Sequence, residues 1–344
     1  MEFVVIDEVG NREDPIYGFG HVPYIYEIGK FEITNEEYAE FLNAVAKYDD
    51  PYSLYSPSMS MGLFGGIDRF SKEGIYVYHP KQGWGKRPVV YVSWYDLARL
   101  ANWYHYKKPC TGRAELGTTE GTNNLGAYDT RNFPKDHTVM IDYRKLPFRR
   151  NKKALYWIPN ENEWYKAAHY DPTINSQRKY WDYPVRTNNV PNNSEPPGDE
   201  YSVNFFRDTF AIGKPDFLTE VGAYRLACTY FGTYDQGGNV WEWLENWRLE
   251  DRGAEKVRAV RGGSATYSEI GLHARNTDPG NPSHEKFIWG GRLARAHVTS
   301  SGKVHYSKVS YIPFDRYLKK IIKKILHGNN AKKFLNLFKK SHQI

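Results

Sequence analysis

Three segments of the chain place apolar residues every three or four positions, which is the spacing of one face of an α-helix. They cover residues 33–48, 92–106 and 158–172. Each segment starts with a hydroxyl or amide residue followed three positions later by an acid: Thr34 and Glu37, Ser93 and Asp96, Asn160 and Glu163. This pairing is typical of a capping box at a helix N-terminus. We therefore expect three capped helices.

Short apolar runs elsewhere favour strands. "YEIGKFEI" (26–33) and "PVVYVSW" (88–94) are rich in β-branched and aromatic residues, as strands are. Residues 111–152 and 171–220 show little periodicity and contain many Asn, Pro, Gly and Thr residues. We expect ordered loops there, because a compact domain retains long loops when they serve a function or are fixed by other groups.

Composition narrows the class of fold. The 344 residues include 10 tryptophans, 28 tyrosines and 29 glycines, which favours an aromatic-packed fold with much irregular backbone over a helical bundle. Cys110 and Cys228 are too few and too far apart for a disulfide scaffold. The N-terminus does not have the pattern of a secretory signal, and no run of apolar residues is long enough to span a bilayer. Together these features predict a cytoplasmic protein.

The basic character of the chain is confined to its C-terminal end. Residues 303–344 contain eleven Lys or Arg residues and one acid, whereas the rest of the chain carries slightly more acids than bases. We therefore expect a domain over 1–302 followed by a basic tail over 303–344, and we consider nucleic acid an improbable partner. Residues 312–326 predict an amphipathic helix with lysines on one face. Such a helix either binds an anionic membrane surface or an acidic partner, or docks on its own domain.

The run "GTYDQGGNVWEWLENW" (232–247) combines three tryptophans with glycines and acids, which is unusual for a regular helix or strand. With "FEITNEEYAEFLN", "RPVVYVSWYDLARLANW", "WIPNENEWYKAAHY", "VRAVRGGSATYS" and "GGRLARA", it resembles the sulfatase-modifying-factor family, whose members include formylglycine-generating enzymes. The resemblance covers residues 15 to 297. It implies an α+β domain of the C-type-lectin-like kind, with a small, mostly antiparallel sheet, few helices and extensive loops.

The resemblance also implies structural calcium. One site would use the carboxylates of Asp235 and Glu242 and the main-chain carbonyls of Gly238 and Val240. Calcium prefers six to eight hard oxygen ligands, and glycines allow carbonyls to turn toward it. The alternative is an aromatic core segment whose acids face water.

A second family calcium site maps onto Asn204, the carbonyl of Phe205, and Asp216. The segment that follows Asn204 lacks the acidic and glycine-rich cluster expected of such a site. Asn204 could equally be a turn residue that binds its own backbone.

The sequence departs from the family at the catalytic position. Family members that oxidise a substrate cysteine use two cysteines after the "GGS" stretch to bind copper(I), a metal that prefers thiolates. Tyr267 and Leu272 stand at about those positions here, and Cys110 and Cys228 match neither. We therefore assign no catalytic residue and expect no copper.

Asn-rich loops after this position resemble the binding face of family members that bind ligands. The candidate ligand-binding residues are Tyr267, Asn276, Asp278, Asn281 and His284. The leading hypothesis is a non-catalytic module that recognises a protein or glycan ligand. The alternative is a formylglycine-generating-type oxidoreductase, or another enzyme, that uses the same cleft with a different catalytic arrangement. The same loop could also be filler between structural segments.

Overall fold

The computed structural model describes residues 1–135, 149–249 and 256–307, with the side chains of Leu249 and Lys256 excepted. Met1–Ser307 form one compact unit, and a second unit covers Lys308–Ile344. The expected amphipathic helix at 312–326 therefore lies outside the described residues. Within the described residues, no helix is both long enough and apolar enough to cross a membrane.

Three helices start where the sequence predicts them. Their bounds are α1 (Asn35–Val45), α3 (Trp94–His105) and α4 (Glu161–His169). In each, the N-cap side chain accepts a hydrogen bond from the third residue's backbone, and that residue's carboxylate accepts one from the N-cap backbone. The three predicted capping boxes are thus confirmed. Two shorter helices, α2 (Ser58–Met61) and α5 (Glu269–Leu272), complete the helices of the described residues.

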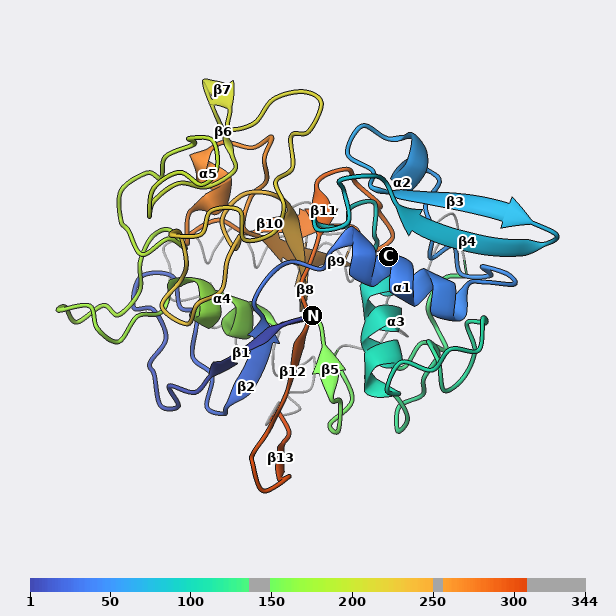
Figure 1. Cartoon of the computed structure of the whole chain (residues 1–344). Coiled ribbons are helices and arrows are strands. Elements are labelled where there is room, and N and C mark those ends of the chain that lie inside the picture. The colour runs from blue at the N-terminus through green and yellow to red at the C-terminus, as the bar shows by residue number, and fades with distance from the viewer. Residues whose placement is uncertain (136–148, 250–255, 308–344) are drawn as a thin grey trace, which may run out of the picture. The chain divides into compact units, whose positions relative to one another are not determined.

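Two sheets form the centre of the unit (Figure 1). The first contains β1 (Phe3–Ile6), β2 (Tyr26–Gly29), β12 (Ala294–Val298) and β13 (Val304–His305) in that order, with β5 (Tyr156–Trp157) also paired to β12. The second has the order β10 (Asp278–Gly280), β9 (Lys256–Arg261), β8 (Trp241–Leu249) and β11 (Trp289–Gly290). Among the pairs of neighbouring strands in the described residues, only β8 and β11 run parallel. The fold is therefore α+β with mostly antiparallel sheets.

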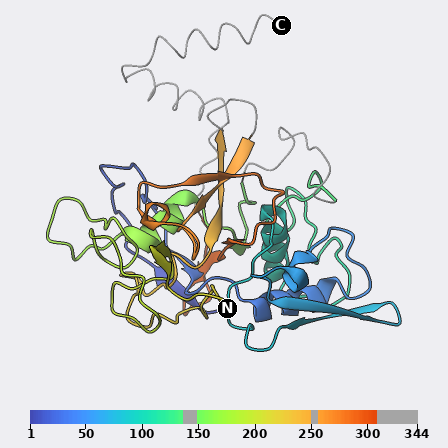
Figure 2. The same cartoon turned by 90° about the horizontal axis from the view of Figure 1, so that it is seen from above.

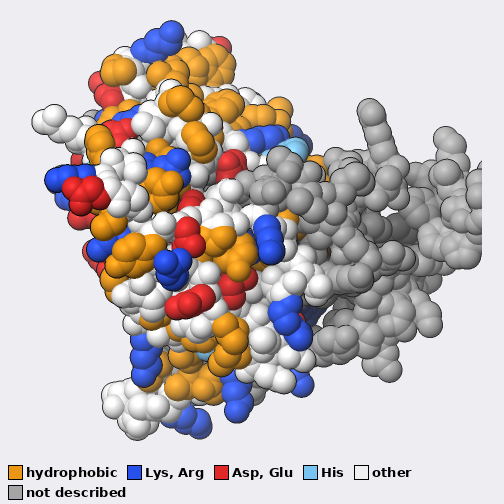
Figure 3. All heavy atoms as spheres, turned by 90° about the vertical axis from the view of Figure 1, so that its right-hand side faces the viewer, with side chains coloured by type: hydrophobic (Ala, Val, Ile, Leu, Met, Phe, Trp, Pro, Cys, Tyr) orange, Lys and Arg blue, Asp and Glu red, His pale blue; other side chains and the backbone are white. Residues whose placement is uncertain are grey.

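Two small hairpins lie outside these sheets: β3 (Ile67–Lys72) with β4 (Ile75–Pro80), and β6 (Phe206–Arg207) with β7 (Thr209–Phe210). On the side of the unit that carries β3 and β4, Lys and Arg side chains are mixed with Asp and Glu side chains and with hydrophobic groups (Figure 3). No single sign of charge dominates the described residues visible in that view.

β8 is the central strand for the site described below. It runs between α4 and α3, as two views at right angles show (Figures 1 and 2). Trp94 at the start of α3 donates a hydrogen bond from Nε1 to the Leu244 carbonyl, 3.1 Å away. Trp241 and Trp243 of β8 are buried in the main hydrophobic core. The tryptophans of the 232–247 run thus fix one strand between two helices.

The strand expected at 88–94 is wrong. Val89, Val90 and Val92 are buried, which explains the apolar pattern. However, Tyr91 has a left-handed φ of 59°, which a regular strand does not contain. The main chain bonds instead to separate segments: the Val89 amide donates to the Ile33 carbonyl, and the Tyr91 amide to Lys286. The predicted strand at 26–33 is shorter than expected and ends at Gly29.

The two long segments expected to be loops contain little regular structure. In the described part of 111–152, the structure shows turns and isolated bridges. In 171–220 it shows only the β6–β7 hairpin as strand.

Candidate functional site

The loop before β8 is held against a second loop by close backbone contact. Gly238 has a φ of 91°, and a Cβ on it would lie 2.2 Å from the Asn204 carbonyl oxygen. Only glycine fits this position. The Asn239 amide donates to the same carbonyl, and the Gly238 amide donates to Gly262. The glycines of the run therefore allow residues 238 and 239 to pack directly on residue 204.

Glu242, at the start of β8, forms a buried ion pair. Both of its oxygens accept hydrogen bonds from Arg292, at 2.7 Å and 2.8 Å. Trp164 of α4 donates from Nε1 to Glu242 Oε2 at 2.8 Å. Neither Glu242 nor Arg292 is more than 1% exposed. Arg292 also donates to the main-chain carbonyls of Gly29 and Tyr234, so this guanidinium links the two sheets.

Two further carboxylates interact with this pair. Glu32 is buried and accepts hydrogen bonds from Asn239 Nδ2 at 2.8 Å and from the Val240 amide at 3.2 Å. Burial, followed by the nearby charges of Asp235 and Glu242, raises the pKa of Glu32 well above its usual range. Among the described residues, the Arg292 guanidinium is thus ion-paired with Glu242 alone and interacts with Glu32 and Asp235 through longer-range electrostatics.

Asp235 is the third of these carboxylates, and it is partly buried. Its Oδ2 accepts a hydrogen bond from the Gly222 amide at 2.6 Å. Burial raises the pKa of Asp235 to about 6, and the nearby Glu242 also raises it, while the Gly222 amide and Arg292 act in the opposite direction. Burial, together with the neighbouring carboxylates, therefore disfavours ionisation of Glu32 and Asp235, which is the condition that a bound cation relieves.

Asn204 contributes an oxygen that has no partner. Its amide nitrogen donates to the Phe217 carbonyl and to Asn239 Oδ1, but its own Oδ1 is buried without a hydrogen bond among the described residues. Asp216 lies next to Phe217 in the chain, yet its carboxylate forms a 2.8 Å ion pair with Arg87 and is 44% exposed. The structure thus brings Asn204 next to the first set of residues through Asn239, whereas Asp216 is engaged by Arg87.

The described side chains of this region do not form a metal site by themselves. Among the described residues, no three His, Cys, Asp or Glu side chains are arranged to hold a metal ion. The expected calcium sites combine side chains with main-chain carbonyls. The donor set of carboxylate, amide and carbonyl oxygens is the chemistry that calcium prefers.

The two positions that would hold the family's cysteines differ in environment. Leu272, at the end of α5, is 1% exposed and belongs to an apolar cluster with residues such as Phe205 and Tyr224. Tyr267 is 40% exposed, and its ring contacts Trp241 edge-on at 5.3 Å between centroids. Cys110 and Cys228 are free thiols in other segments.

The other proposed ligand-binding residues lie just before β10, in β10 and in the loop that follows it. The Asn276 carbonyl accepts a hydrogen bond from Arg261, and Asp278 pairs with Val260 of β9. Asn281 accepts a hydrogen bond from the Ser283 amide, and the His284 ring stacks on Trp289 at 6.3 Å. Asp278 therefore lies on the β10 edge of this sheet, whereas the His284 ring lies against Trp289 of β11 at the opposite edge. Tyr267 contacts Trp241 of β8.

An aromatic row, which the sequence analysis missed, connects Tyr267 to neighbouring loops. The Phe206 amide donates to the Tyr267 carbonyl. From Phe206 a chain of ring contacts with centroids 4.9–5.2 Å apart continues through Phe210, Phe217, Phe64 and Phe287. Phe210 and Phe287 are 39% and 41% exposed. Because these phenylalanines come from distant segments, no local pattern indicates the row.

Glu32 and Arg292 were also missed. Both lie within motifs that carry the family resemblance, "FEITNEEYAEFLN" and "GGRLARA", so their positions were visible. An acid inside an otherwise apolar run at 31–33 is the one local signal of a buried carboxylate, since such groups are retained when they are paired.

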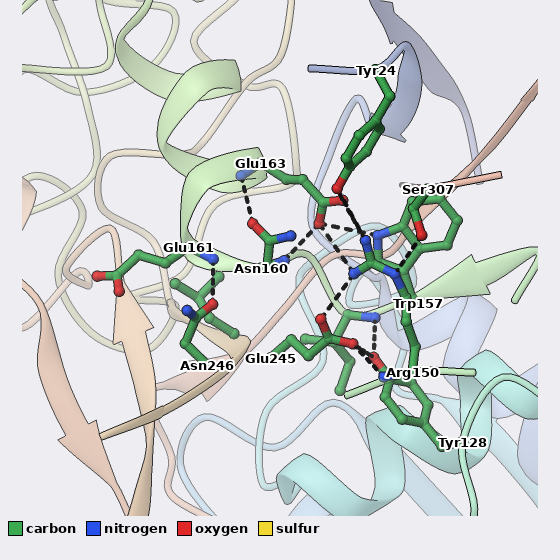
Figure 4. A network of polar contacts seen from close by, with 12 residues as sticks. Tyr24, Tyr128, Arg150, Trp157, Asn160, Glu161, Glu163, Glu245, Asn246 and Ser307 are labelled. Atoms are coloured by element: carbon green, nitrogen blue, oxygen red, sulfur yellow. Dashed lines mark hydrogen bonds and ion pairs between the residues drawn. The ribbon is translucent and has the colours of Figure 1, made fainter. Parts of the chain in front are cut away.

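A second buried ion network lies further along β8 (Figure 4). Arg150 donates to Glu163 Oε1 at 2.7 Å and to Glu245 Oε2 at 2.9 Å. Tyr24 and Trp157 also donate to Glu163, and the Arg150 guanidinium lies 4.3 Å from the Trp157 ring centroid. Arg150, Glu163 and Glu245 are all almost fully buried. This network connects α4 with β8.

Comparisons with known proteins agree with the fold. The family described as "Sulfatase-modifying factor enzyme 1-like domain" matches residues 21–297. No curated protein matches the chain.

Three similar solved structures are "Crystal Structure of CarF", the variable protein 1 of Treponema denticola and PvdO from Pseudomonas aeruginosa. CarF is 21% identical, with a TM-score of 0.48 over 86% of this chain and 98% of its own. The Treponema protein is 17% identical, with a TM-score of 0.45 over 85% and 94%. PvdO is also 17% identical, with a TM-score of 0.42 over 85% and 93%. No functional argument rests on likenesses of this size.

Proposed function

The chain belongs to the sulfatase-modifying factor enzyme 1-like family, and on this premise we propose that it is a non-catalytic, calcium-stabilised module that binds a protein or glycan ligand. The observation that carries the proposal is the burial of Leu272. The position expected for the second family cysteine is filled by an aliphatic side chain packed among apolar residues. Neither an isobutyl group nor the phenol of Tyr267 can replace a thiolate as a copper(I) ligand.

Incubation with a peptide containing Cys-x-Pro-x-Arg, copper(I) and oxygen tests the loss of oxidase activity. We expect the peptide mass to stay unchanged, and we expect no high-affinity copper(I) binding in a titration. Conversion of the peptide cysteine to an aldehyde, abolished by Cys110→Ser or Cys228→Ser, would establish the enzyme alternative instead. The cysteine variants separate a true reaction of this chain from copper-driven oxidation in solution.

The aromatic row supports a recognition role. Tyr267, Phe210 and Phe287 each expose about two-fifths of their surface. The buried Phe217 and Phe64 contact the rings of Phe210 and Phe287, and the buried Trp241 contacts that of Tyr267. Rigid aromatic side chains offer large contact area at low entropic cost, and they are enriched where proteins bind partners. They extend the predicted ligand-binding set of Tyr267, Asn276, Asp278, Asn281 and His284.

Affinity capture with matched variants tests this face. We expect Tyr267→Ala and Phe287→Ala to lose most of the captured ligand. Phe70→Ala, which removes a ring that is 58% exposed on β3, should capture as much ligand as the unchanged protein. Glycosidase treatment of the ligand separates a glycan from a protein epitope. Equal capture by all three variants contradicts the assignment of this face.

Calcium is proposed at two places. In the first, the Asp235 and Glu242 carboxylates and the carbonyls of Gly238 and Val240 would hold the ion. The charge imbalance among Glu32, Asp235 and Glu242 supports this assignment. The ion would supply positive charge and fix the loop before β8.

The second calcium ion would use Asn204, the Phe205 carbonyl and Asp216. The support is the buried Asn204 Oδ1, which lacks a partner among the described residues. The ion pair between Asp216 and Arg87 would have to open or share its carboxylate. We therefore expect the second ion to bind more weakly than the first.

The proposal for the basic tail is that it attaches the module to an anionic membrane surface or an acidic partner. Its support is the lysine-rich amphipathic pattern of residues 312–326. Sedimentation with anionic vesicles, compared between the full chain and a chain lacking 303–344, tests the membrane form.

A further inference from the structure

A separate pocket lies at the C-terminal end of α3, where that helix meets β5 and β12. Its volume is about 500 Å³, and its lining includes Tyr104, Tyr156, Lys107, Lys108 and Arg295. None of these residues belongs to the aromatic row or to the proposed calcium sites. The pocket is therefore a second candidate site with its own chemistry.

One wall of the pocket is largely apolar and contains two mutually tilted aromatic rings. The rings of Tyr104 and Tyr156 lie 5.2 Å apart between centroids. Leu155 and Ala296 add aliphatic surface, and Val298 is 50% exposed at the same site. A planar hydrophobic group fits against such a wall, because aromatic rings pack in offset or tilted arrangements at about this spacing.

Tyr104 also carries a buried polar atom that lacks a partner among the described residues. The residue is only 8% exposed, and its hydroxyl has no hydrogen-bond partner among the described residues. A buried hydroxyl without a partner is uncommon in proteins and calls for an explanation. An acceptor oxygen on a bound ligand would satisfy it.

The charges of the pocket favour an anion. Glu27 is the one acid of the lining, and it is already paired with Arg295 at 2.5 Å and with His297 at 3.0 Å. Lys108 pairs with Glu40. Lys107 is exposed and forms no ion pair with any described residue. One unpaired ammonium group thus remains at the pocket.

The backbone holds the two lysines in an unusual conformation. Lys107 and Lys108 both have left-handed φ angles, 65° and 61°. Their amides donate to the Tyr104 and Trp103 carbonyls and close the end of α3. Glycine or asparagine would adopt this conformation at less cost. The presence of lysine at both positions is consistent with a role for their side chains.

We propose that this pocket binds a small organic monoanion with a planar apolar body, such as an aromatic carboxylate. The ring system would lie against Tyr104 and Tyr156, and the carboxylate would accept hydrogen bonds from Lys107 Nζ and the Tyr104 hydroxyl. A single unpaired ammonium and a single hydroxyl match one carboxylate better than a multiply charged phosphate chain.

Calorimetric titration of the full chain with 2-naphthoate tests the proposal, with the neutral 2-naphthamide as the matched ligand. We expect saturable binding of the acid and at least tenfold weaker binding of the amide. Lys107→Gln should raise the Kd for the acid about five- to tenfold, and added salt should narrow that difference. Lys72→Gln, an exposed lysine on β3, should leave the Kd unchanged.

The Tyr104→Phe variant tests whether the Tyr104 hydroxyl binds the ligand or supports the fold. Because the hydroxyl has no partner, its removal should leave Tm unchanged or raise it, while the Kd for 2-naphthoate rises about fivefold. A lower Tm would show that the hydroxyl already supports the fold and would overturn this use of it. Absence of saturable binding up to about 10 mM, or equal affinity for acid and amide, would overturn the proposal as a whole.

Discussion

Two buried carboxylates on the same strand, Glu242 and Glu245 of β8, belong to ion networks of different completeness. Glu245 shares Arg150 with Glu163, and the oxygens of both acids accept hydrogen bonds from side chains or amides such as Tyr24, Trp157 and Tyr128 (Figure 4). Glu242 pairs with Arg292, and the nearby Glu32 and Asp235, which lack an ion pair with that guanidinium among the described residues, both have raised pKa values.

The difference separates a structural network from a binding site. A fully hydrogen-bonded network rigidifies the fold, and it is costly to disturb because each remaining charge would be buried alone. Both networks have more acid than base, but the Arg292 network has three carboxylates near one guanidinium, whereas the Arg150 network has two. The Arg292 network also adjoins Asn239, which accepts a hydrogen bond from the amide nitrogen of Asn204; the Oδ1 of Asn204 has no partner among the described residues. We therefore expect added cations to bind at the Arg292 network and stabilise it, and to have no effect on the Arg150 network.

The largest expected effect comes from removing the cation of the complete network. Arg150→Met keeps apolar bulk against Trp157 but leaves Glu163 and Glu245 buried without their guanidinium. We expect a loss of about 3–5 kcal/mol in the free energy of unfolding, measured by urea denaturation. The control is Arg131→Met, which removes a 57% exposed partner of Asp129 and should leave the free energy of unfolding nearly unchanged, because water screens an exposed pair. Similar losses in the free energy of unfolding of both variants would show that the buried Arg150 network contributes no more than an exposed ion pair.

Calcium should produce the next largest effect, and only at the incomplete network. At a hundredfold excess over its dissociation constant, calcium should stabilise the protein by about 2.7 kcal/mol relative to chelator. Asp235→Asn combined with Glu242→Gln should abolish this gain, whereas Glu13→Gln, at an exposed acid, should preserve it. Thermal melting with and without chelator measures the difference. An unchanged melting temperature in the wild-type protein would refute calcium binding.

The pH dependence of the free energy of unfolding, measured without calcium, should show a smaller effect whose direction is fixed by the pKa shift. The pKa of Asp235 is about 6 in the folded protein and about 3.9 in an unfolded chain, so the folded state binds this proton more tightly. Its contribution to stability is therefore fully present below about pH 4 and is lost as the pH rises through about 6. We expect a decline of about 2 kcal/mol over this range in chelator, absent in Asp235→Asn. A wild-type curve parallel to that of the variant contradicts the raised pKa.

Calcium should reverse that trend, because the ion competes with the proton for the same carboxylate. Stabilisation by calcium should therefore be larger at pH 7.5 than at pH 5. Equal stabilisation at the two pH values would place the ion away from Asp235.

The helices could be predicted from the sequence because their signals are local, whereas the class of fold followed from the family resemblance of several motifs taken together. A capping box lies within four residues, and the stripe of apolar residues lies within one helix, as for Thr34 and Glu37 in α1. The strand at 88–94 could not be judged in this way. Its valines are buried in hydrophobic clusters while its main chain bonds to Ile33 and Lys286, and the left-handed Tyr91 leaves no mark in the hydrophobic pattern.

The candidate site was predictable only in part for the same reason. Asp235 and Glu242 lie in one conspicuous run, whereas Glu32 and Arg292 reach them from segments about 200 and 50 residues away in the sequence. The pairing of Arg150 with Glu163 and Glu245 is likewise set by tertiary packing. Burial and charge balance, which decide what each acid does, appear only once these segments are brought together.

The smallest expected effect tests whether the N-cap of α4 and the Arg150 network are coupled in their contributions to stability. Asn160 caps the helix through its side chain, while Glu163 serves both the capping box and Arg150. Asn160→Ala removes only the cap side chain and should cost about 1 kcal/mol in urea denaturation. Thr34→Ala removes the matching cap of α1, where Glu37 takes no part in the Arg150 network, and should cost the same. A loss at Asn160 well above that at Thr34 would mean that the cap holds Glu163 in place for Arg150, so that the complete network depends on the helix end as well as on its own ion pairs.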